Sequence, residues 1–263
     1  MTECSIMIAL STVLSLIKLA ELPYGGSVTV ASMLPIAIAV FRHGGKWGFA
    51  CAAVNAFVQM LLGLNNFSYF TTWQSIVALA IFDYVLAFAV FSLSGCFKKL
   101  VKNQAVAMLL GVLLASILRY GCHVISGATV WAGLSIPSEA ALIYSLSYNA
   151  TYMIPETVVL AVSTLYIGSV IDFTRPTPTR MSSSLDTVSA YCYMGAGLSI
   201  LVGAVAAVVT IFPAMQDAET GEFVFSNIVN ADFTLALILG GVCLGIAAVL
   251  VIFALIRKRK ASI

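Results

Sequence analysis

The side chains best suited to chemistry in this chain are a few charged groups that interrupt long apolar stretches. Asp83, Arg119 and Glu156 each lie inside such a stretch, and His123 follows Arg119 by one helical turn. A charged side chain at the centre of a bilayer costs about 3 kcal/mol or more, so it is rare without a purpose. The Asp83 carboxylate is suited to face a cationic ligand, with Arg119 as its alternative partner. For Glu156, pairing with Arg119 is the favoured interpretation and ligand contact is the alternative.

A second pattern extends from Arg119 toward the end of the same apolar stretch. Four residues recur at every fourth position: Arg119, His123, Gly127 and Trp131. Such residues share one face of any helix that continues through them. Gly127 leaves room for a flat molecule to approach the backbone, and the Trp131 ring attracts a cation by roughly 0.5–2 kcal/mol. The alternative is a Trp of the interfacial belt beside a small-residue packing site, but the register with His123 favours a ligand-binding face.

The next apolar stretch holds an unusual density of hydroxyl and amide groups between Tyr144 and Glu156. In a membrane each such group must find a partner, which favours a buried polar face over a lipid-exposed one. Asn149 lies three residues before Tyr152 and seven before Glu156, so the three share a helical face. The Asn149 amide both donates and accepts, which suits the edge of a heterocycle. Pro155 removes a backbone donor and predicts a kink.

Several classes of function are disfavoured by what the sequence lacks. It contains no G-x-x-x-x-G-K-[ST] phosphate loop, no H-E-x-x-H and no G-x-S-x-G. The net charge of +2, without a basic patch laced with aromatic residues, gives no sign of nucleic-acid binding. The six cysteines occur singly, which indicates buried small hydrophobes and not disulfides or metal ligands. We therefore expect a binding protein for a small cation, with no catalytic residue, metal or cofactor.

The elements that must position these residues are transmembrane helices. Of 263 residues, 61% are hydrophobic and 9% are charged, against about 25% charged in soluble domains. A helix of about 20 apolar residues spans a bilayer, and this sequence offers one such stretch after another. The expected fold is an all-α integral membrane protein. Eight spans are predicted, at Cys4–Ala20, Val28–Phe41, Trp47–Leu64, Trp73–Phe97, Ala105–Ile125, Ala140–Ile171, Val188–Phe212 and Thr234–Ile256.

Lysine and arginine gather in alternate loops, which predicts the orientation in the membrane. With eight spans, both termini then lie in the cytoplasm. The cations of the cytoplasmic loops and tail are Arg42, Lys46, Lys98, Lys99, Lys102, Arg175, Arg180, Arg257, Lys258, Arg259 and Lys260. A stretch rich in Pro, Thr and Ser follows the sixth span and is typical of a linker, residues 174–187. It divides a six-span module, residues 1–173, from a two-span hairpin with a basic tail, residues 188–263.

Two further patterns concern helix packing. In the first span, Ser5, Ala9 and Thr12 form a ridge of small residues. Such a ridge packs helices closely, either within the protein or against a partner. In the third span, Asn55 and Gln59 share a face, and interhelical hydrogen bonding is their expected role.

Taken together, these motifs resemble the thiamine-specific substrate-binding subunit, or S component, of energy-coupling-factor vitamin transporters. The resemblance extends over about Met1–Phe173. The spacing H-x3-G-x3-W followed by Y-x4-N gives it most of its specificity. The matching segments are Gly25-Gly26-Ser27-Val28 with Met33-Leu34-Pro35, Phe41-Arg42 followed by Lys46-Trp47-Gly48, Asp83-Tyr84, His123 to Trp131, and Tyr144 to Asn149.

This resemblance implies a six-helix bundle with an outward-facing thiamine site, capped by the loop after the first span. It implies ligand-binding roles for Asp83, Tyr84, His123, Gly127, Trp131, Tyr144 and Asn149. Asp83 stands where a glutamate is expected in the family, and the C-terminal hairpin is an addition to the six-span pattern. Thiamine has a cationic thiazolium and a flat aminopyrimidine, so it requires a carboxylate, an aromatic platform and an amide. The residues alone indicate the same chemistry.

The leading hypothesis is a multi-pass protein of the cell membrane that captures extracellular thiamine. In the family that the chain resembles, transport is driven by a transmembrane coupling subunit and two cytoplasmic ATPases, and S components dock on the coupling subunit through a small-residue ridge. The alternative within transport is a stand-alone proton-coupled thiamine carrier, with Glu156 and His123 relaying protons. A membrane enzyme is disfavoured because no catalytic constellation is present. The clustered polar face argues against a structural protein without a small ligand.

Overall fold

Helices make up most of the chain in the computed structural model, which describes residues 2–22, 25–132, 141–181, 187–211, 214 and 225–260. The chain divides into two compact units, Met1–Thr179 and Arg180–Ile263. Within these described residues, four helical stretches are long and apolar enough to cross a membrane, namely Trp73–Lys99, Gln104–Thr129, Ala141–Val170 and Phe233–Ala254. The expected helical membrane architecture is confirmed at this level, while the count of eight spans stays a prediction.

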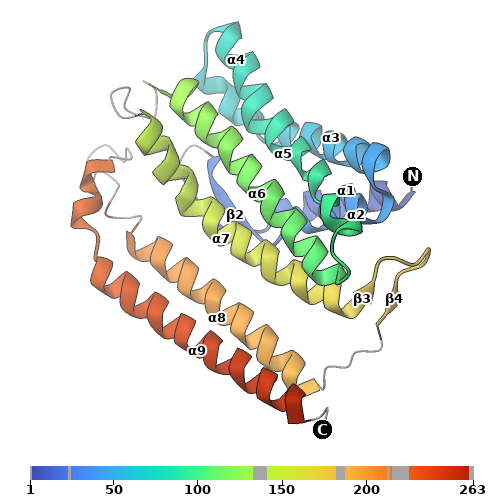
Figure 1. Cartoon of the computed structure of the whole chain (residues 1–263). Helices are drawn as coiled ribbons and strands as arrows, with labels where there is room; N and C mark the ends of the chain where they lie inside the picture. Colours follow the sequence, from blue (N-terminus) through green and yellow to red (C-terminus); the bar gives the residue numbers. More distant parts are fainter. Residues whose placement is uncertain are drawn as a thin grey trace. The chain divides into compact units, whose positions relative to one another are not determined.

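The first unit is built around a long pair of helices, α6 and α7, that lie side by side (Figure 1). On α3, Gln59 Nε2 donates to Ser15 Oγ of α1 at 3.2 Å, which confirms the predicted interhelical bond of Gln59. The α-helices of this unit are α1 (Thr2–Leu16), α2 (Leu34–His43), α3 (Gly45–Leu62), α4 (Trp73–Leu79), α5 (Ala87–Ala89), α6 (Gln104–Thr129) and α7 (Ala141–Val170). Shorter 3-10 turns occur at Leu64–Tyr69, Val90–Leu93 and Cys96–Lys99.

A β-hairpin occupies the region between the first two predicted spans. α1 ends at Leu16, and β1 (Lys18–Glu21) then pairs antiparallel with β2 (Ser27–Thr29). The predicted spans Cys4–Ala20 and Val28–Phe41 are therefore wrong at the ends that face each other.

The physical reason for this hairpin lies in its glycines and in the residues after them. Gly25 has a φ of 94°, a left-handed conformation that glycine adopts without steric cost. Val28 and Thr29 are β-branched, which favours an extended backbone. Helix α2 starts only at Leu34, with Pro35 in its first turn, where a missing backbone donor is tolerated.

The fourth predicted span, Trp73–Phe97, has changing helical geometry. α4 passes into a π-helical segment, η3 (Ala80–Leu86), and the chain continues through α5 and a 3-10 turn. Such π-helical segments are rare in proteins overall, and those that occur often lie at functional sites. Asp83 lies in this one. The remaining predicted spans of this unit correspond to α3, α6 and α7 within a few residues.

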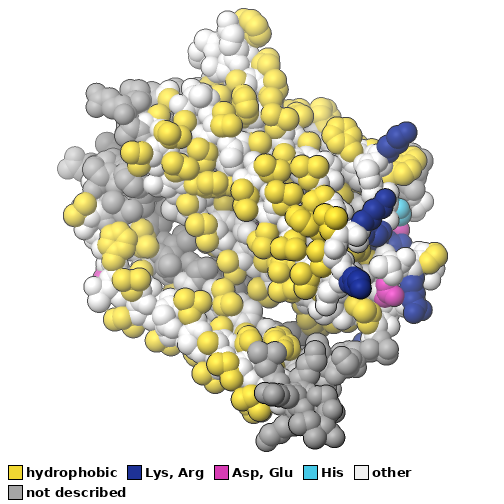
Figure 2. Space-filling view, viewed as in Figure 1, with side chains coloured by type: hydrophobic (Ala, Val, Ile, Leu, Met, Phe, Trp, Pro, Cys, Tyr) yellow, Lys and Arg dark blue, Asp and Glu magenta, His cyan; other side chains and the backbone are white. Residues whose placement is uncertain are grey.

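Arg42, at the end of α2, binds the segment that follows α7. The Arg42 side chain is 6% exposed and forms an ion pair with Glu3. Its guanidinium also donates to the backbone carbonyls of Phe173 at 3.3 Å, Arg175 at 3.2 Å and Pro176 at 2.9 Å. We call these contacts the Arg42 clasp. Figure 2 shows hydrophobic side chains over much of the visible surface, with Lys and Arg gathered at one edge.

The same segment is also folded on itself. The Asp172 carboxylate accepts hydrogen bonds from the hydroxyl and amide of Thr174 and from Arg175 Nε. The Thr174 hydrogen bonds hold the pKa of Asp172 below its usual value. Two short strands, β3 (Ile171–Asp172) and β4 (Thr179–Arg180), pair here. Part of the predicted linker, residues 182–186, lies outside the described residues.

The described part of the second unit contains two long helices, α8 (Thr187–Ile211) and α9 (Phe233–Lys260). A 3-10 turn, η8 (Phe225–Asn230), comes shortly before α9. The two helices approach closely, since Ser199 Oγ donates to the Cys243 carbonyl at 2.8 Å. A Cβ added at Gly203 would lie 2.8 Å from the Cβ of Cys243, so a larger residue there requires a shift. The predicted spans Val188–Phe212 and Thr234–Ile256 correspond to these helices, although Phe212 lies outside the described residues.

Candidate ligand-binding site

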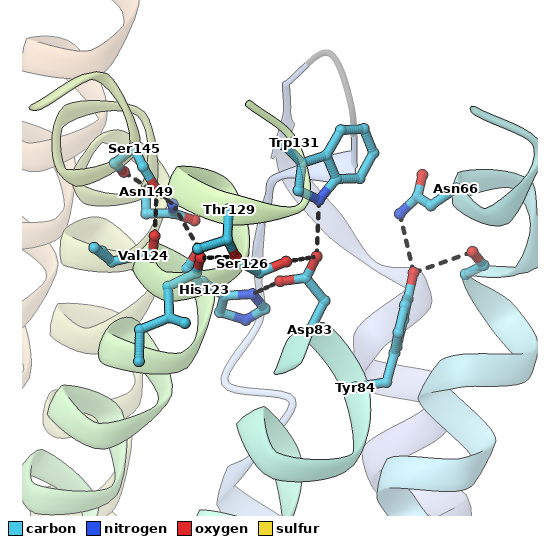
Figure 3. Close-up of polar contacts among 12 residues, drawn as sticks. Asn66, Asp83, Tyr84, His123, Val124, Ser126, Thr129, Trp131, Ser145 and Asn149 are labelled. Atoms are coloured by element: carbon cyan, nitrogen blue, oxygen red, sulfur yellow. Dashed lines mark hydrogen bonds and ion pairs between the residues drawn. The ribbon is translucent and has the colours of Figure 1, made fainter. Parts of the chain in front are cut away.

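The Asp83 carboxylate is the centre of the predicted site, and three donors surround it (Figure 3). One oxygen, Oδ1, lies 3.0 Å from His123 Nδ1. The other, Oδ2, accepts from Ser126 Oγ at 2.8 Å and from Trp131 Nε1 at 2.9 Å. Asp83 therefore joins the π-helical segment to α6 and to Trp131, two residues beyond the end of α6. Its alternative pairing with Arg119 is not observed, because Arg119 pairs with Glu156.

Trp131 reaches this carboxylate from outside the helix. α6 ends at Thr129, so the helix does not persist to Trp131, and the condition for one shared helical face from Arg119 to Trp131 is not met. The chain turns here because the amides of Val130 and Trp131 both donate to the Ser126 carbonyl, at 2.7 and 3.2 Å. The turn directs the indole N–H to Asp83.

The Trp131 ring is buried within the protein, with 7% of its surface exposed. Phe70 meets it edge-on with ring centroids 4.9 Å apart, and Tyr69 lies 5.8 Å away at a tilted angle. This position does not fit the alternative of an interfacial belt residue. It places a rigid aromatic surface beside a carboxylate.

His123 has one engaged nitrogen and one unpartnered nitrogen. Because the carboxylate at Nδ1 can only accept, Nδ1 bears the proton, and a neutral imidazole then presents Nε2 as an acceptor. Nε2 is buried and has no hydrogen-bond partner in the part of the chain that the structure describes. A buried polar atom without a partner costs about 1–3 kcal/mol. A ligand with a donor group at this position removes that cost.

Asn149 lies next to His123 and links α7 to α6. Its Nδ2 donates to the Ser145 carbonyl at 2.9 Å and to the His123 carbonyl at 3.4 Å. Its Oδ1 accepts from the Tyr152 hydroxyl at 2.6 Å, as expected of residues on one helical face. Ser145 Oγ makes a second link between the helices, to the Val124 carbonyl at 2.9 Å.

Tyr84, another predicted site residue, has hydrogen-bond partners outside this cluster. The Tyr84 hydroxyl donates to the Gly63 carbonyl and accepts from Asn66 Nδ2, both at 3.0 Å, so it is directed toward α3 and the turn after it (Figure 3). Gly127 and Tyr144 are buried. The structure thus brings together Asp83, His123, Trp131 and Asn149, and gives Tyr84 separate partners.

Sequence reasoning missed Ser126 as a site residue, and it included Gly26 in a matching segment without a structural role. Ser126 lies one helical turn after His123, and this spacing is the signal that could have identified it. Gly26 packs against α7: an added Cβ would lie 2.8 Å from Tyr152 Cδ1 and 3.0 Å from the Tyr148 hydroxyl. Adjacent glycines in a short loop indicate such a close approach. The β1–β2 hairpin therefore lies directly against the polar face of α7.

Glu156 on α7 and Arg119 on α6 form a buried ion pair. Glu156 Oε2 lies 3.2 Å from Arg119 Nη1, which confirms the favoured interpretation of Glu156. The Arg119 guanidinium also lies 4.6 Å from the centre of the Phe88 ring. No group of three or more His, Cys, Asp or Glu side chains is placed to hold a metal ion within the described ranges.

Comparison with known proteins gives two findings. Residues 1–173 match the family model described as thiamine transporter protein. Over 171 residues the chain is 36% identical to the thiamine transporter ThiT of Bacillus subtilis (strain 168), and the aligned region covers 61% of this chain and 85% of that protein. No solved structure matches the chain. The family match does not extend to residues 174–263.

Proposed function

This chain belongs to the thiamine transporter protein family, and from that premise we propose that it captures extracellular thiamine and delivers it through an ATP-driven energy-coupling-factor complex. Family membership confirms the resemblance that the sequence motifs indicated. It makes the chain a membrane transport protein and not an enzyme.

The observation that supports thiamine as the ligand is the environment of Asp83. Two of its three donors, Ser126 Oγ and Trp131 Nε1, are neutral, while the Arg119 guanidinium is engaged by Glu156. An acid that no Arg or Lys of the described residues neutralises, bonded to a buried indole, suits a flat cation. Thiamine is such a molecule.

We assign a role to each predicted site residue on this basis. The Asp83 carboxylate faces the thiazolium, and Trp131 stacks on the ligand. The unpartnered His123 Nε2 accepts a hydrogen bond from the amino group of the aminopyrimidine, beside the Asn149 amide. The wall around the ligand is assigned to Tyr84, Gly127 and Tyr144.

We also propose how the chain is organised and powered. Residues 1–173 form the six-span thiamine-binding module, residues 174–187 a linker, and residues 188–263 an additional two-span hairpin, with both termini in the cytoplasm. The sequence contains no phosphate-binding loop, so the energy comes from partners: a coupling subunit and two cytoplasmic ATPases. Ser5 and Ala9 are exposed on α1, which leaves the small-residue ridge accessible to the coupling subunit.

Tryptophan fluorescence offers a direct test, because the chain has three tryptophans and two of them are exposed. Trp47 is 52% exposed and Trp73 is 70% exposed, whereas Trp131 is buried beside Asp83. The double variant Trp47→Phe/Trp73→Phe leaves Trp131 as the single reporter. Titration of the purified variant with thiamine is expected to give saturable quenching. Absence of saturable binding, in a variant that remains folded, contradicts the proposal.

A further inference from the structure

Glu156 is a buried titratable residue that the proposed ligand contacts do not use. Only 5% of its surface is exposed. Its Oε2 faces Arg119, and its Oε1 lies 2.9 Å from Thr29 Oγ1. A carboxylate can only accept, so the Thr29 hydroxyl donates to it. The Ser32 hydroxyl, 2.8 Å from Thr29 Oγ1, then donates to Thr29.

This set of contacts joins three segments that are far apart in the sequence. Thr29 ends strand β2, Arg119 lies on α6 and Glu156 lies on α7. Thr29, Ser32 and Glu156 are all at most 5% exposed. Water therefore does not compete for these hydrogen bonds, and each one is strengthened by its neighbours in the low-dielectric interior. We call this set the Glu156 junction.

The backbone at the junction is in a conformation that needs support. Ala31, between Thr29 and Ser32, has a φ of 51°, although it is not a glycine. Left-handed conformations of such residues cost free energy and persist only where surrounding contacts hold them. The hydrogen bonds of Thr29 and Ser32 flank Ala31 on both sides. The junction thus helps to hold this turn in place, together with the backbone bonds from the Ala31 amide to the Thr29 carbonyl and from the Leu34 amide to the Ala31 carbonyl.

The turn continues into the hairpin that lies against the candidate site. Gly26 contacts Tyr152, and the Tyr152 hydroxyl donates to Asn149. The position of the hairpin and that of the Asn149 amide are therefore linked through one side chain. A displacement of β2 is therefore expected to move Tyr152 and, through it, the Asn149 amide of the proposed ligand-binding site.

We propose that Glu156 and Arg119 are positioning residues: with Thr29 they hold the β1–β2 hairpin against α7 and thereby slow the release of bound thiamine. They do so without touching the ligand. The inference rests on the proposed function for its ligand, but the position of the hairpin can be measured without any ligand.

Two sets of variants test this proposal in the full-length chain. Thr29→Val keeps the shape of the side chain and removes the hydroxyl, while Thr29→Ser keeps the hydroxyl and is the matched control. Arg119→Met/Glu156→Met removes both charges together, so that neither is left buried and unpaired. Stopped-flow fluorescence gives the association and dissociation rates of thiamine. Hydrogen exchange of residues 18–22 and 25–30 in the ligand-free protein reports the hairpin.

The expected result is selective. Thr29→Val and the double variant should release thiamine at least roughly tenfold faster, with association near that of the parent, and their hairpin amides should exchange faster. Thr29→Ser should behave like the parent. Unchanged dissociation and exchange in Thr29→Val, or in the folded double variant, would overturn the proposal. If the parent itself does not bind thiamine, the proposed function fails, whereas the exchange data still decide whether the junction holds the hairpin.

Discussion

At the scale of single residues, the Asp83 carboxylate organises the groups that are proposed to meet the ligand. It fixes the tautomer of His123 and the orientation of Trp131 at the same time. The Ser126 hydroxyl donates a third hydrogen bond to the carboxylate and keeps it in place. The result is a preorganised acid, ring and acceptor, which reduces the entropy that ligand binding must overcome.

The role of Trp131 can be divided into its ring and its N–H group. Trp131→Ala removes both, and we expect thiamine affinity to fall by at least roughly tenfold, or about 1.4 kcal/mol. Trp131→Phe keeps a smaller aromatic surface and loses the bond to Asp83, so its loss of affinity should be smaller than that of Trp131→Ala. Isothermal titration calorimetry measures both variants, and it needs no tryptophan reporter. Equal affinity in Trp131→Ala and the parent would place the ligand elsewhere.

Residue type and spacing predicted part of this arrangement, whereas its ligand-binding role stays a prediction. Asp83, His123 and Trp131 were identified as intramembrane groups at suitable intervals, and the structure joins them by direct hydrogen bonds. The hydroxyl of Tyr84 was not predictable in the same way. Adjacent residues on a helix point in different directions, and Tyr84 finds Asn66 and Gly63 on another element. No sequence pattern indicates such long-range partners.

At the scale of elements, hydropathy predicted the helices and missed the irregular segments that shape the site. Apolar content is the same whether a stretch is α-helical, π-helical or extended, so hydropathy assigns the π-helical segment Ala80–Leu86 and the outer parts of the hairpin between α1 and α2 to helices. Polar residues explain why these irregularities persist. Thr29 and Asp83 each bind side chains of other elements, and these bonds favour the observed backbone.

The Arg42 clasp gives a prediction for the stability of the first unit. Arg42→Ala removes the donors to three backbone carbonyls and the ion pair of Arg42 with Glu3, which among the described residues keeps only its contact with His43. We expect a loss on the order of 2 kcal/mol, which lowers the melting temperature by about 4–8 °C. Arg42→Lys should recover little, because an ammonium cannot reach several acceptors in a forked geometry.

A thermal-shift assay of the purified protein measures this effect. Lys99→Ala is the matched control, since Lys99 is an exposed cation of the same predicted loop set. Its melting temperature should stay within about 1 °C of the parent. If Arg42→Ala is as mild as Lys99→Ala, the clasp contributes nothing to stability.

At the scale of the whole molecule, the boundary between the two units bears on which part binds the ligand. Every proposed ligand residue precedes residue 174, and the family match ends at residue 173. The Arg42 clasp reaches Pro176, so a shortened chain must retain that residue. We predict that a chain ending at Arg180 inserts in the membrane and binds thiamine within about threefold of the full-length affinity. A folded, inserted chain that fails to bind would show that residues 181–263 contribute to the site.

Separation of binding from transport is the last prediction, and it concerns the source of energy. Small residues let helix backbones approach, and bulky ones prevent it. Because Ser5 and Ala9 are exposed on α1, Ser5→Trp/Ala9→Trp should abolish thiamine uptake by cells while the purified variant keeps its affinity. A proton-coupled carrier predicts a different outcome, in which the parent protein alone accumulates thiamine in liposomes under a pH gradient, without partner or ATP. The residues that would relay protons in such a carrier, His123 and Glu156, have other partners. His123 binds Asp83, and Glu156 binds Arg119 and Thr29. Accumulation in those liposomes would nevertheless replace the partner-driven mechanism. Uptake that requires both the small-residue ridge on α1 and the ATPases would support the partner-driven mechanism.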